Sequence, residues 1–369
     1  MTTLTRAQVL AHRWRAQGLD RRHTDVLAVD LPVLDLGVAD VPTPAAATAL
    51  AIRGAQAPDD TLALVWGARG APALHRRASL QAVADALWPA SDEDATRRVA
   101  NSRMRQGAEL GIASFRAVAE AVREVLTGAD GLVSKAELSR GVSDRIPDDL
   151  NYDCPPCGAR HVFGSVLQDA GLAGGAELVR VGRGTAFRLL PGLRTPTARA
   201  GFDALVRSYL HLLGPAAPAD VAAYFGVAVA EVRSVWPDDV AGFVVAGRTV
   251  TALADDEASL RSRATARGVR LLPPGDPWLQ ARDRAFLVPK ERHSAVWKSI
   301  SPPGALLVDG EVVGTWRAGT KGRRLEVTVA SFTDLSAHVL SALEDELPAV
   351  AAARGATGTR LLPLQVSDE

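Results

Sequence analysis

Residues 202–215 read FDALVRSYLHLLGP. Apolar side chains recur at i, i+3, i+4 and i+7 from Phe202 to Leu213, which predicts an amphipathic helix that Gly214-Pro215 ends. Two shorter helices are predicted over Pro218–Phe225 and Val229–Trp236, and Phe243–Thr251 alternates like two strands around an Ala246-Gly247 turn. Three short helices with a terminal hairpin are typical of the winged-helix fold, which usually offers its third helix to a DNA groove.

The same order of elements is predicted twice more, closer to the N-terminus. Residues 113–198 suit helices over Phe115–Leu126, after the N-cap Ser134, and over Val162–Gly171, followed by strands over Glu177–Val181 and Thr185–Leu190. The N-terminal third suits helices over Thr5–Gly18, Ala45–Gly54 and Leu80–Trp88, a hairpin of Leu62–Trp66 with Ala73–Arg77, and a connecting helix over Asp92–Leu110.

The pattern of predicted elements changes after Leu253. Short β-type runs separated by Pro and Gly are predicted over Val269–Leu272, Ala285–Val288, Ala305–Val308, Glu311–Trp316 and Arg324–Ala330. Asp309-Gly310 is a strong two-residue hairpin signal, and one helix is predicted over Leu335–Ala352. We therefore predict an α+β protein of three tandem winged-helix domains and a small β-rich C-terminal domain, with boundaries at 1–112, 113–198, 199–254 and 255–369.

Length and composition are those of an ordinary globular protein. The 369 residues are 47% apolar and 23% charged, enough for several cores. No run approaches the roughly 18 apolar residues of a membrane span, and the N-terminus lacks the apolar core of a signal peptide. We expect a cytoplasmic protein that does not associate with membranes, needs no cofactor and is a monomer.

Positive charge is clustered although the net charge is zero. Neutrality argues mildly against a dedicated DNA binder, but separated charge can still build one positive face, and solvated surface arginines are an equally good interpretation. The predicted wings, helices and basic clusters supply the candidate DNA contacts Arg76, Arg77, Lys135, Arg180, Arg183, Arg188, Arg233, Arg248, Arg282, Arg284, Arg317, Lys321, Arg323 and Arg324. Most tryptophans lie in apolar runs and are expected in cores. Trp278, in a Pro-rich loop, has the best claim to face DNA.

Several stretches resemble one known family, the tandem winged-helix DNA glycosylases. They are Leu271–Leu279 with Arg282-Asp283-Arg284, Val308–Arg317, and Leu36-Gly37 followed by Ala49–Arg53. The resemblance covers essentially the whole chain. It implies a bacterial enzyme class that excises alkylated purines and unhooks interstrand crosslinks, with duplex DNA as the partner.

The chain departs from that family at the catalytic motif. The family places glutamine, then glutamine or aspartate, on either side of one residue just after Leu-Gly, where the pair holds the water that attacks C1′. Here the sequence is Gly37-Val38-Ala39-Asp40-Val41, so the two positions are Ala39 and Val41, or Val38 and Asp40 if the register slides by one. Asp40 is the one candidate for water activation, and its alternative role is to cap the following helix.

A second cluster of chemically capable residues is Cys154-x-x-Cys157-x-x-x-His161. Three soft ligands at this spacing suit zinc, and Asp153 or a distant histidine could complete the set of four. A plain cysteine pair in a Pro-rich turn is the alternative, and redox chemistry is less favoured because no βαβ context surrounds the pair.

These observations leave three hypotheses for function. The first is a monofunctional DNA glycosylase acting in repair through Asp40 and water, since no lysine near the motif could form a Schiff base. The second is a non-catalytic DNA binder, either a damage sensor or a regulator, that has lost the glutamines. The third is a protein-interaction module, which a net charge of zero would permit.

Overall fold

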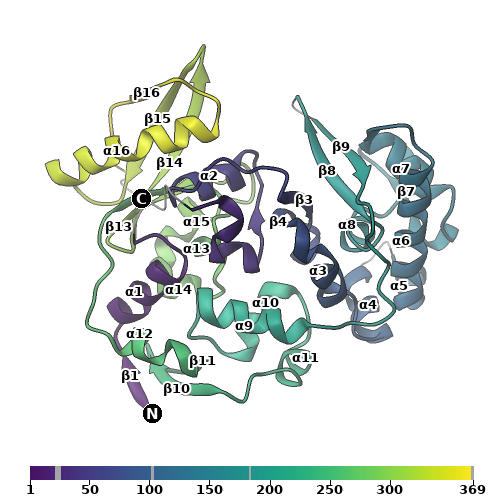
Figure 1. The fold of residues 1–369 in the computed structure, drawn as a ribbon, viewed down its shortest axis with the longest axis horizontal. Helices are drawn as coiled ribbons and strands as arrows, with labels where there is room; N and C mark the ends of the chain where they lie inside the picture. Colours follow the sequence, from purple (N-terminus) through teal and green to yellow (C-terminus); the bar gives the residue numbers. More distant parts are fainter. Residues whose placement is uncertain (21–25, 101–103, 183, 367–369) are drawn as a thin grey trace. The chain divides into compact units, whose positions relative to one another are not determined.

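The computed structural model describes residues 1–20, 26–100, 104–182 and 184–366, and the chain divides into two compact units (Figure 1). Unit 1 comprises Met1–Asp59, Val206–Val221 and Pro237–Glu369, and unit 2 comprises Asp60–Leu205 and Ala222–Trp236. Helices and strands are mixed throughout, so the chain is α+β, as predicted. Within the described ranges, no helix is both long and apolar enough to cross a membrane.

Unit 1 contains both ends of the chain and two sheets. The first sheet has the order β1-β10-β11, and the second has the order β12-β13-β14-β15-β16, with β17 also pairing with β15. The strands of unit 1 are β1 (Thr2–Leu4), β2 (Val38–Ala39), β10 (Val240–Val245), β11 (Arg248–Leu253), β12 (Val269–Leu272), β13 (Gly304–Val308), β14 (Glu311–Lys321), β15 (Arg324–Ser331), β16 (Gly358–Leu361) and β17 (Gln365–Val366).

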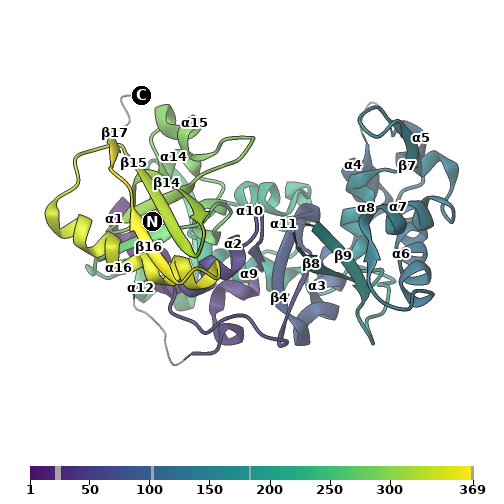
Figure 2. The same ribbon diagram turned by 90° about the horizontal axis from the view of Figure 1, so that it is seen from above.

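The helices of unit 1 are mostly short. They are α1 (Arg6–Ala16), α2 (Ala45–Ala51), α12 (Glu257–Arg261), α13 (Pro277–Gln280), α14 (Arg284–Leu287), α15 (His293–Val296) and α16 (Ala337–Ala353). The long helix α16 packs against β12, β15, β16 and α2, and Figure 2 shows it lying along the C-terminal sheet. The predicted Asp309-Gly310 turn is present, and both residues have the positive φ that a two-residue hairpin requires.

Unit 2 is built around one large apolar core. Its members come from helices and strands between Leu64 and Phe187 and include Trp66, Trp88 and Phe115. The elements are β3 (Leu62–Trp66), β4 (Pro72–Arg76), α3 (Leu80–Leu87), α4 (Asp92–Val99), α5 (Arg105–Glu109), α6 (Ile112–Thr127), β5 (Val133–Ser134), α7 (Lys135–Ser143), β6 (Asn151–Cys154), β7 (Ala159–Val162), α8 (Gly164–Gly171), β8 (Ala176–Val181), β9 (Gly184–Leu189) and α11 (Val229–Arg233).

Two helices have residues in both units, α9 (Phe202–Leu213) and α10 (Pro218–Phe225). Their bounds match the predicted ones, and Gly214-Pro215 follows α9 as expected. The predicted capping box of α7 is also present: the Ser134 hydroxyl accepts from the Glu137 backbone N–H, and the Glu137 carboxylate accepts from the Ser134 backbone N–H.

Among the predicted elements that differ from the structure, three have a clear physical reason. Ala285–Val288 is not a strand, because the Asp283 carbonyl accepts hydrogen bonds from Phe286 and Leu287 and starts the helical turn α14. The helix predicted over Asp92–Leu110 is two helices, since Ala100 is extended and ends α4. The helix predicted from Val162 begins at Gly164, because Val162 pairs with Asn151 in the β6–β7 hairpin.

Candidate functional site

The motif segment after Leu36-Gly37 alternates between buried and accessible side chains. Val38 and Asp40 are buried, Ala39 is half-buried, and Val41 is 50% exposed. Side chains along an extended segment alternate in direction, so a one-residue shift exchanges the two sets. Of the two registers that the sequence allows, Ala39 and Val41 are the pair that reaches the surface. Neither side chain can donate or accept a hydrogen bond.

Asp40 points inward and is occupied by local hydrogen bonds. Its Oδ2 accepts from the Thr43 hydroxyl at 2.9 Å, and its Oδ1 accepts from the backbone N–H of Ala46 at 3.1 Å. Ala46 lies in the first turn of α2, whose own N-cap residue, Pro44, makes no side-chain capping bond. Asp40 therefore satisfies a backbone donor at the start of α2, which is the work of a capping residue.

The end of α2 is fixed by a buried ion pair. Arg53 donates from Nη1 and Nη2 to the two carboxylate oxygens of Asp276 at 2.8 and 3.1 Å, and both side chains are 0% exposed. Its remaining donors bind the carbonyls of Gln17 and Ala49, and Asp276 also accepts from the Trp278 backbone N–H. A buried guanidinium is tolerated only when its charge and donors are matched in this way.

The loop that carries Asp276 also packs on the motif segment. Gly275 has φ of +76°, and a Cβ placed there would lie 3.3 Å from the Val41 carbonyl oxygen and 3.5 Å from the Ala39 Cβ. Residues 271–279 and the segment 36–53 are thus one connected site in unit 1. The sequence indicated both segments but not their pairing, since no local pattern shows that residues so far apart in the chain will meet.

Trp278 does not face solvent, so the expectation that it contacts DNA is wrong. It is 1% exposed and packs edge-on against Trp14, with ring centroids 6.1 Å apart. The loop is rich in proline, but its apolar side chains turn into unit 1. Of its neighbours, Arg284 is exposed and lies over the Trp297 ring, whereas Arg282 is partly buried.

Arg282, Arg284 and Arg248 line a cavity of about 700 Å³ in unit 1. The cavity is not uniformly basic, because Asp220 and Asp283 line it too. Arg248 pairs with Asp220 at 2.9 Å, and Arg13 pairs with Asp283 at 2.6 Å. The positive charge predicted for this wing is therefore partly neutralised at close range.

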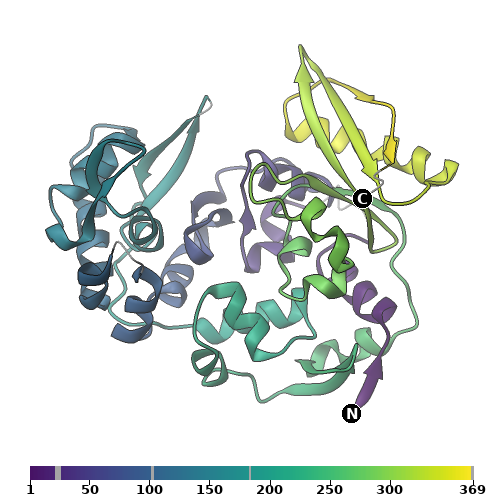
Figure 3. The ribbon, with the colours of Figure 1, turned by 180° about the vertical axis from the view of Figure 1, so that it is seen from behind.

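The β14–β15 hairpin carries the most open basic cluster among the candidates. Lys321 and Arg324 face each other in register at its end, and Arg323 lies in the turn beside Gly322. All three are exposed, and within the described residues no carboxylate forms an ion pair with them. Arg317, nearer the base, donates to the Ser301 carbonyl at 2.7 Å. Figure 3 shows this hairpin extending beyond the rest of its sheet.

The candidate cations of unit 2 are less uniform. Arg77 and Arg188 both pair with Glu177 at 2.8 Å. Burial opposes ionisation of Glu177, but these two guanidinium groups outweigh it and lower its pKa. Arg180 donates to the Thr185 hydroxyl, Arg76 is half-buried, and Arg183 lies outside the described residues. Lys135, at the start of α7, and Arg233, at the end of α11, are exposed.

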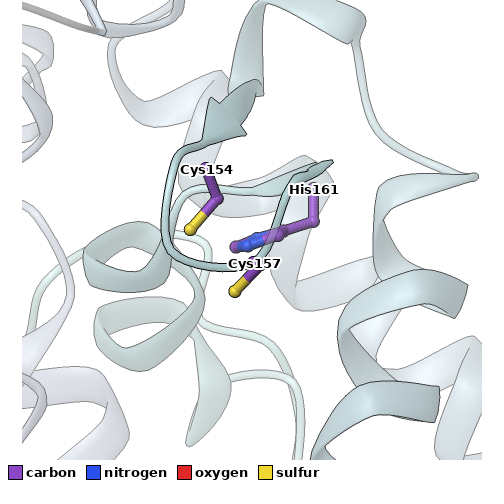
Figure 4. A group of neighbouring side chains, drawn as sticks. All are labelled: Cys154, Cys157 and His161. Carbon is purple, nitrogen blue, oxygen red and sulfur yellow. The ribbon is translucent and has the colours of Figure 1, made fainter.

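Cys154, Cys157 and His161 come together at the β6–β7 hairpin, with their ligand atoms within 4.8 Å of one another (Figure 4). Cys154 ends β6, Cys157 lies in the turn, and His161 lies on β7. The pKa of Cys154 is lowered to about 6, chiefly because the Tyr152 hydroxyl hydrogen-bonds to its sulfur.

A cluster that sequence reasoning missed joins α1 to α9 in unit 1. His12 contacts the His211 carbonyl oxygen at 3.0 Å, and His211 pairs with Asp256 at 2.9 Å. Burial lowers the pKa of His12 to about 4, while the hydrogen bond that His211 donates to the Asp256 carboxylate raises the pKa of His211. Three isolated residues, far apart in the chain, gave no signal in the sequence.

Comparison with known proteins places these features in context. A family model described as DNA glycosylase AlkZ-like matches residues 34–353, a range that includes both the motif segment and the Asp276 loop. The structure is similar to that of Streptomyces sahachiroi DNA glycosylase AlkZ, with a TM-score of 0.73 and 20% identity over 98% of this chain and 100% of that one. No curated protein matches. At this identity, the structural likeness speaks for the fold alone.

Proposed function

Because the chain belongs to the AlkZ-like DNA glycosylase family, we propose that it acts in DNA repair by binding damaged duplex DNA without excising the base. One observation carries this proposal: the motif segment is held by the Arg53–Asp276 pair and by Gly275, but its accessible side chains are Ala39 and Val41. Family membership is the reason to propose damaged DNA as the ligand. The side chains at the motif are the reason to propose that no base is excised.

Excision of a base depends on a water molecule held at the motif. Hydrolysis of an N-glycosidic bond needs a water held against C1′ and a group that stabilises positive charge on the sugar. Two methyl-bearing side chains offer no donor, no acceptor and no charge. The only carboxylate between Gly37 and Arg53 is Asp40, and both of its oxygens already accept hydrogen bonds from residues at the start of α2.

The β14–β15 hairpin is the best candidate for contact with the DNA backbone. We propose that Lys321, Arg323 and Arg324 contact phosphates, since they are exposed and clustered at the end of a two-stranded ribbon. Arg77, Arg188 and Arg248 are weaker candidates, because each is held by a carboxylate. Contacts of this kind position the duplex but read no sequence.

Winged-helix architecture is part of the proposal. Residues 113–198 have the order α6, β5, α7, β6, β7, α8, β8, β9, so the β6–β7 hairpin is inserted between the second and third helices. The sheet order β5-β9-β8 brings the strand between the first two helices beside the wing. In this domain α8 would be the recognition helix, but it has no basic residue and half of its eight residues are buried. We therefore propose that this domain has a structural role and does not insert a helix into DNA. In the 199–254 domain, we propose that the exposed Arg233 on α11 contacts DNA.

Two measurements test the proposal together. The protein should bind generic and methylated duplex DNA with an affinity that falls as salt rises. On the methylated duplex it should free no 7-methyladenine or 7-methylguanine above the spontaneous rate. A chain that fails to bind any duplex at low salt would favour a protein-interaction module instead.

A second candidate function is monofunctional excision through Asp40. Its support is the position of this carboxylate, directly between the two accessible motif residues. Asp40→Asn separates the roles, because an amide keeps an acceptor for the Ala46 N–H but removes the charge. Base release by the wild type that disappears in Asp40→Asn, with unchanged thermal stability, would establish this function over the first.

A further inference from the structure

We propose that Cys154, Cys157 and His161 bind one Zn²⁺ ion at the end of the β6–β7 hairpin in unit 2. The function proposed above does not use this cluster. All three side chains are of the types that zinc prefers, and their ligand atoms lie within 4.8 Å of one another. In a tetrahedral site with Zn–S of about 2.3 Å, two sulfurs lie about 3.8 Å apart, so the three groups need to approach by only about an ångström.

The hairpin register puts Cys154 and His161 on one face. His161 pairs with Tyr152, two residues before Cys154, so their side chains share a side of the ribbon with Cys154. Figure 4 shows the His161 ring directed towards the two sulfurs. Asp153 and Arg160 pair across the opposite face and form an ion pair at 3.4 Å, and Arg160 also binds Asp148 at 2.8 Å. Asp153 therefore does not supply the fourth ligand. The sequence alone had left that role open to it.

The turn between the cysteines holds both sulfurs on one side. The backbone N–H groups of Cys157 and Gly158 both donate to the Cys154 carbonyl, at 3.2 and 2.9 Å. Gly158 has φ of +61°, a conformation that glycine adopts at no steric cost. Pro155 and Pro156 stiffen the same turn. The two sulfurs are thus brought near each other before any ion binds.

His161 is oriented for binding by its second nitrogen. Its Nδ1 lies 2.8 Å from the Val162 carbonyl oxygen, to which only a protonated nitrogen can donate. Nε2 is then the nitrogen with the lone pair. A histidine that binds zinc through one nitrogen usually donates its other ring N–H to a carbonyl or carboxylate oxygen, which fixes the orientation of the ring. Tyr152 packs edge-on against the ring at 5.1 Å and fixes its plane.

Three protein ligands leave a fourth position for water. No further Cys, His, Asp or Glu joins this cluster among the residues that the structure describes. Cys157 is exposed, so we place the fourth position on the solvent side. Such a site would tie the hairpin's tip together. Its base is already tied to α7, since the Ser143 hydroxyl accepts from the Val162 N–H and the Ser143 carbonyl accepts from Asn151.

The test is metal content combined with cobalt spectroscopy on the full chain. Protein purified with reductant and one equivalent of zinc, then desalted, should retain about one zinc per chain. Co²⁺ added to the metal-free protein should give thiolate-to-cobalt charge-transfer absorption and the intense visible bands of tetrahedral cobalt. Cys157→Ser should abolish the charge-transfer intensity that its sulfur contributes and lower zinc retention at least tenfold. Since Cys157 is exposed, this change should leave the circular dichroism spectrum as it is.

A matched control uses the other candidate cluster, His12, His211 and Asp256. His211→Asn should leave zinc retention and the cobalt spectrum of the β6–β7 site unchanged. Loss of zinc in His211→Asn but not in Cys157→Ser would overturn the proposal, because the zinc would then be bound by the cluster that contains His211. It would equally be overturned if the wild type retained no zinc with both thiols titratable, or if the cysteines formed a disulfide that zinc did not prevent under air.

Discussion

Arg53 and Asp276 form a bidentate ion pair, and both side chains are fully buried. The pair ties the end of α2 to the loop whose Gly275 packs on Ala39 and Val41. Two segments more than two hundred residues apart in the chain are thereby held as one site.

Breaking this pair should destabilise unit 1 strongly. Arg53→Met leaves the Asp276 charge buried and unpaired, and such losses typically cost about 3–5 kcal/mol of unfolding free energy. Arg53→Lys should recover little of it, because a single ammonium cannot span both carboxylate oxygens and also reach the Gln17 carbonyl. Urea unfolding followed by tryptophan fluorescence measures the effect.

The control for that series is Arg207→Ala, which removes a partly exposed pair with Asp239. It should cost less than about 1 kcal/mol. Equal losses in Arg207→Ala and Arg53→Met would contradict the special weight given to the buried pair.

Asp40 should behave as a capping residue in stability measurements. Asp40→Ala leaves the Ala46 N–H without its acceptor and should cost about 1–2 kcal/mol. Asp40→Asn should cost much less, because its amide oxygen can accept from Ala46 and its amide nitrogen can donate to the Thr43 hydroxyl. Thermal melts of the two variants compare these values, and a costly Asn variant would show that the negative charge itself matters.

The β14–β15 hairpin should carry part of the salt dependence of DNA binding. Replacing Lys321, Arg323 and Arg324 by alanine should reduce the slope of log affinity against log salt by about 2 to 3. A charge-matched control replaces Arg145, Arg207 and Arg261, all of which form ion pairs with carboxylates. Fluorescence anisotropy with a labelled duplex at several salt concentrations distinguishes them. Equal slopes in the two triple variants would argue against a role of the hairpin in phosphate contact.

Unit 2 should lose stability as the pH falls, through His75. Burial, with a smaller effect from Arg76, lowers the pKa of His75 to about 4. The unfolded chain takes up this proton near pH 6.5 and the folded chain does not. The contribution of His75 therefore leaves the free energy of unfolding at its full value above about pH 6.5. It lowers this free energy as the pH drops towards 4, by roughly 3 kcal/mol at most.

His75→Gln removes the titrating group and should flatten this part of the profile. Chemical unfolding at intervals between pH 7 and pH 4.5 gives the comparison. If both proteins have the same slope over that range, His75 is not the group responsible.

Sequence patterns predicted most of the elements but few of the contacts. Helical spacing and turn residues located α2, α6, α7 and α9, because those signals lie within a dozen residues. Short apolar runs such as Ala285–Val288 do not distinguish strand from helical turn, and here a backbone hydrogen bond to the Asp283 carbonyl decides. Sequence placed Trp278 at the surface from the prolines around it, while its burial depends on Trp14, far away in the chain.

The candidate site was predicted in the same uneven way. The cysteine and histidine spacing already suggested that Cys154, Cys157 and His161 would meet, since all three lie on one hairpin. The motif register could not be resolved from residue types, because it depends on which side chains the fold turns outward. Surface charge was overestimated at Arg77 and Arg188, because both pair with Glu177.

Base release from methylated duplex DNA, measured side by side for the wild type and Ala39→Gln/Val41→Gln, tests the central claim most directly. The double variant places the family's water-holding amides at the two accessible positions of an intact scaffold. At DNA concentrations where both proteins are bound, we predict no 7-methylpurine release above background by the wild type and measurable release by the variant. Wild-type release that matches or exceeds that of the variant would contradict the claim.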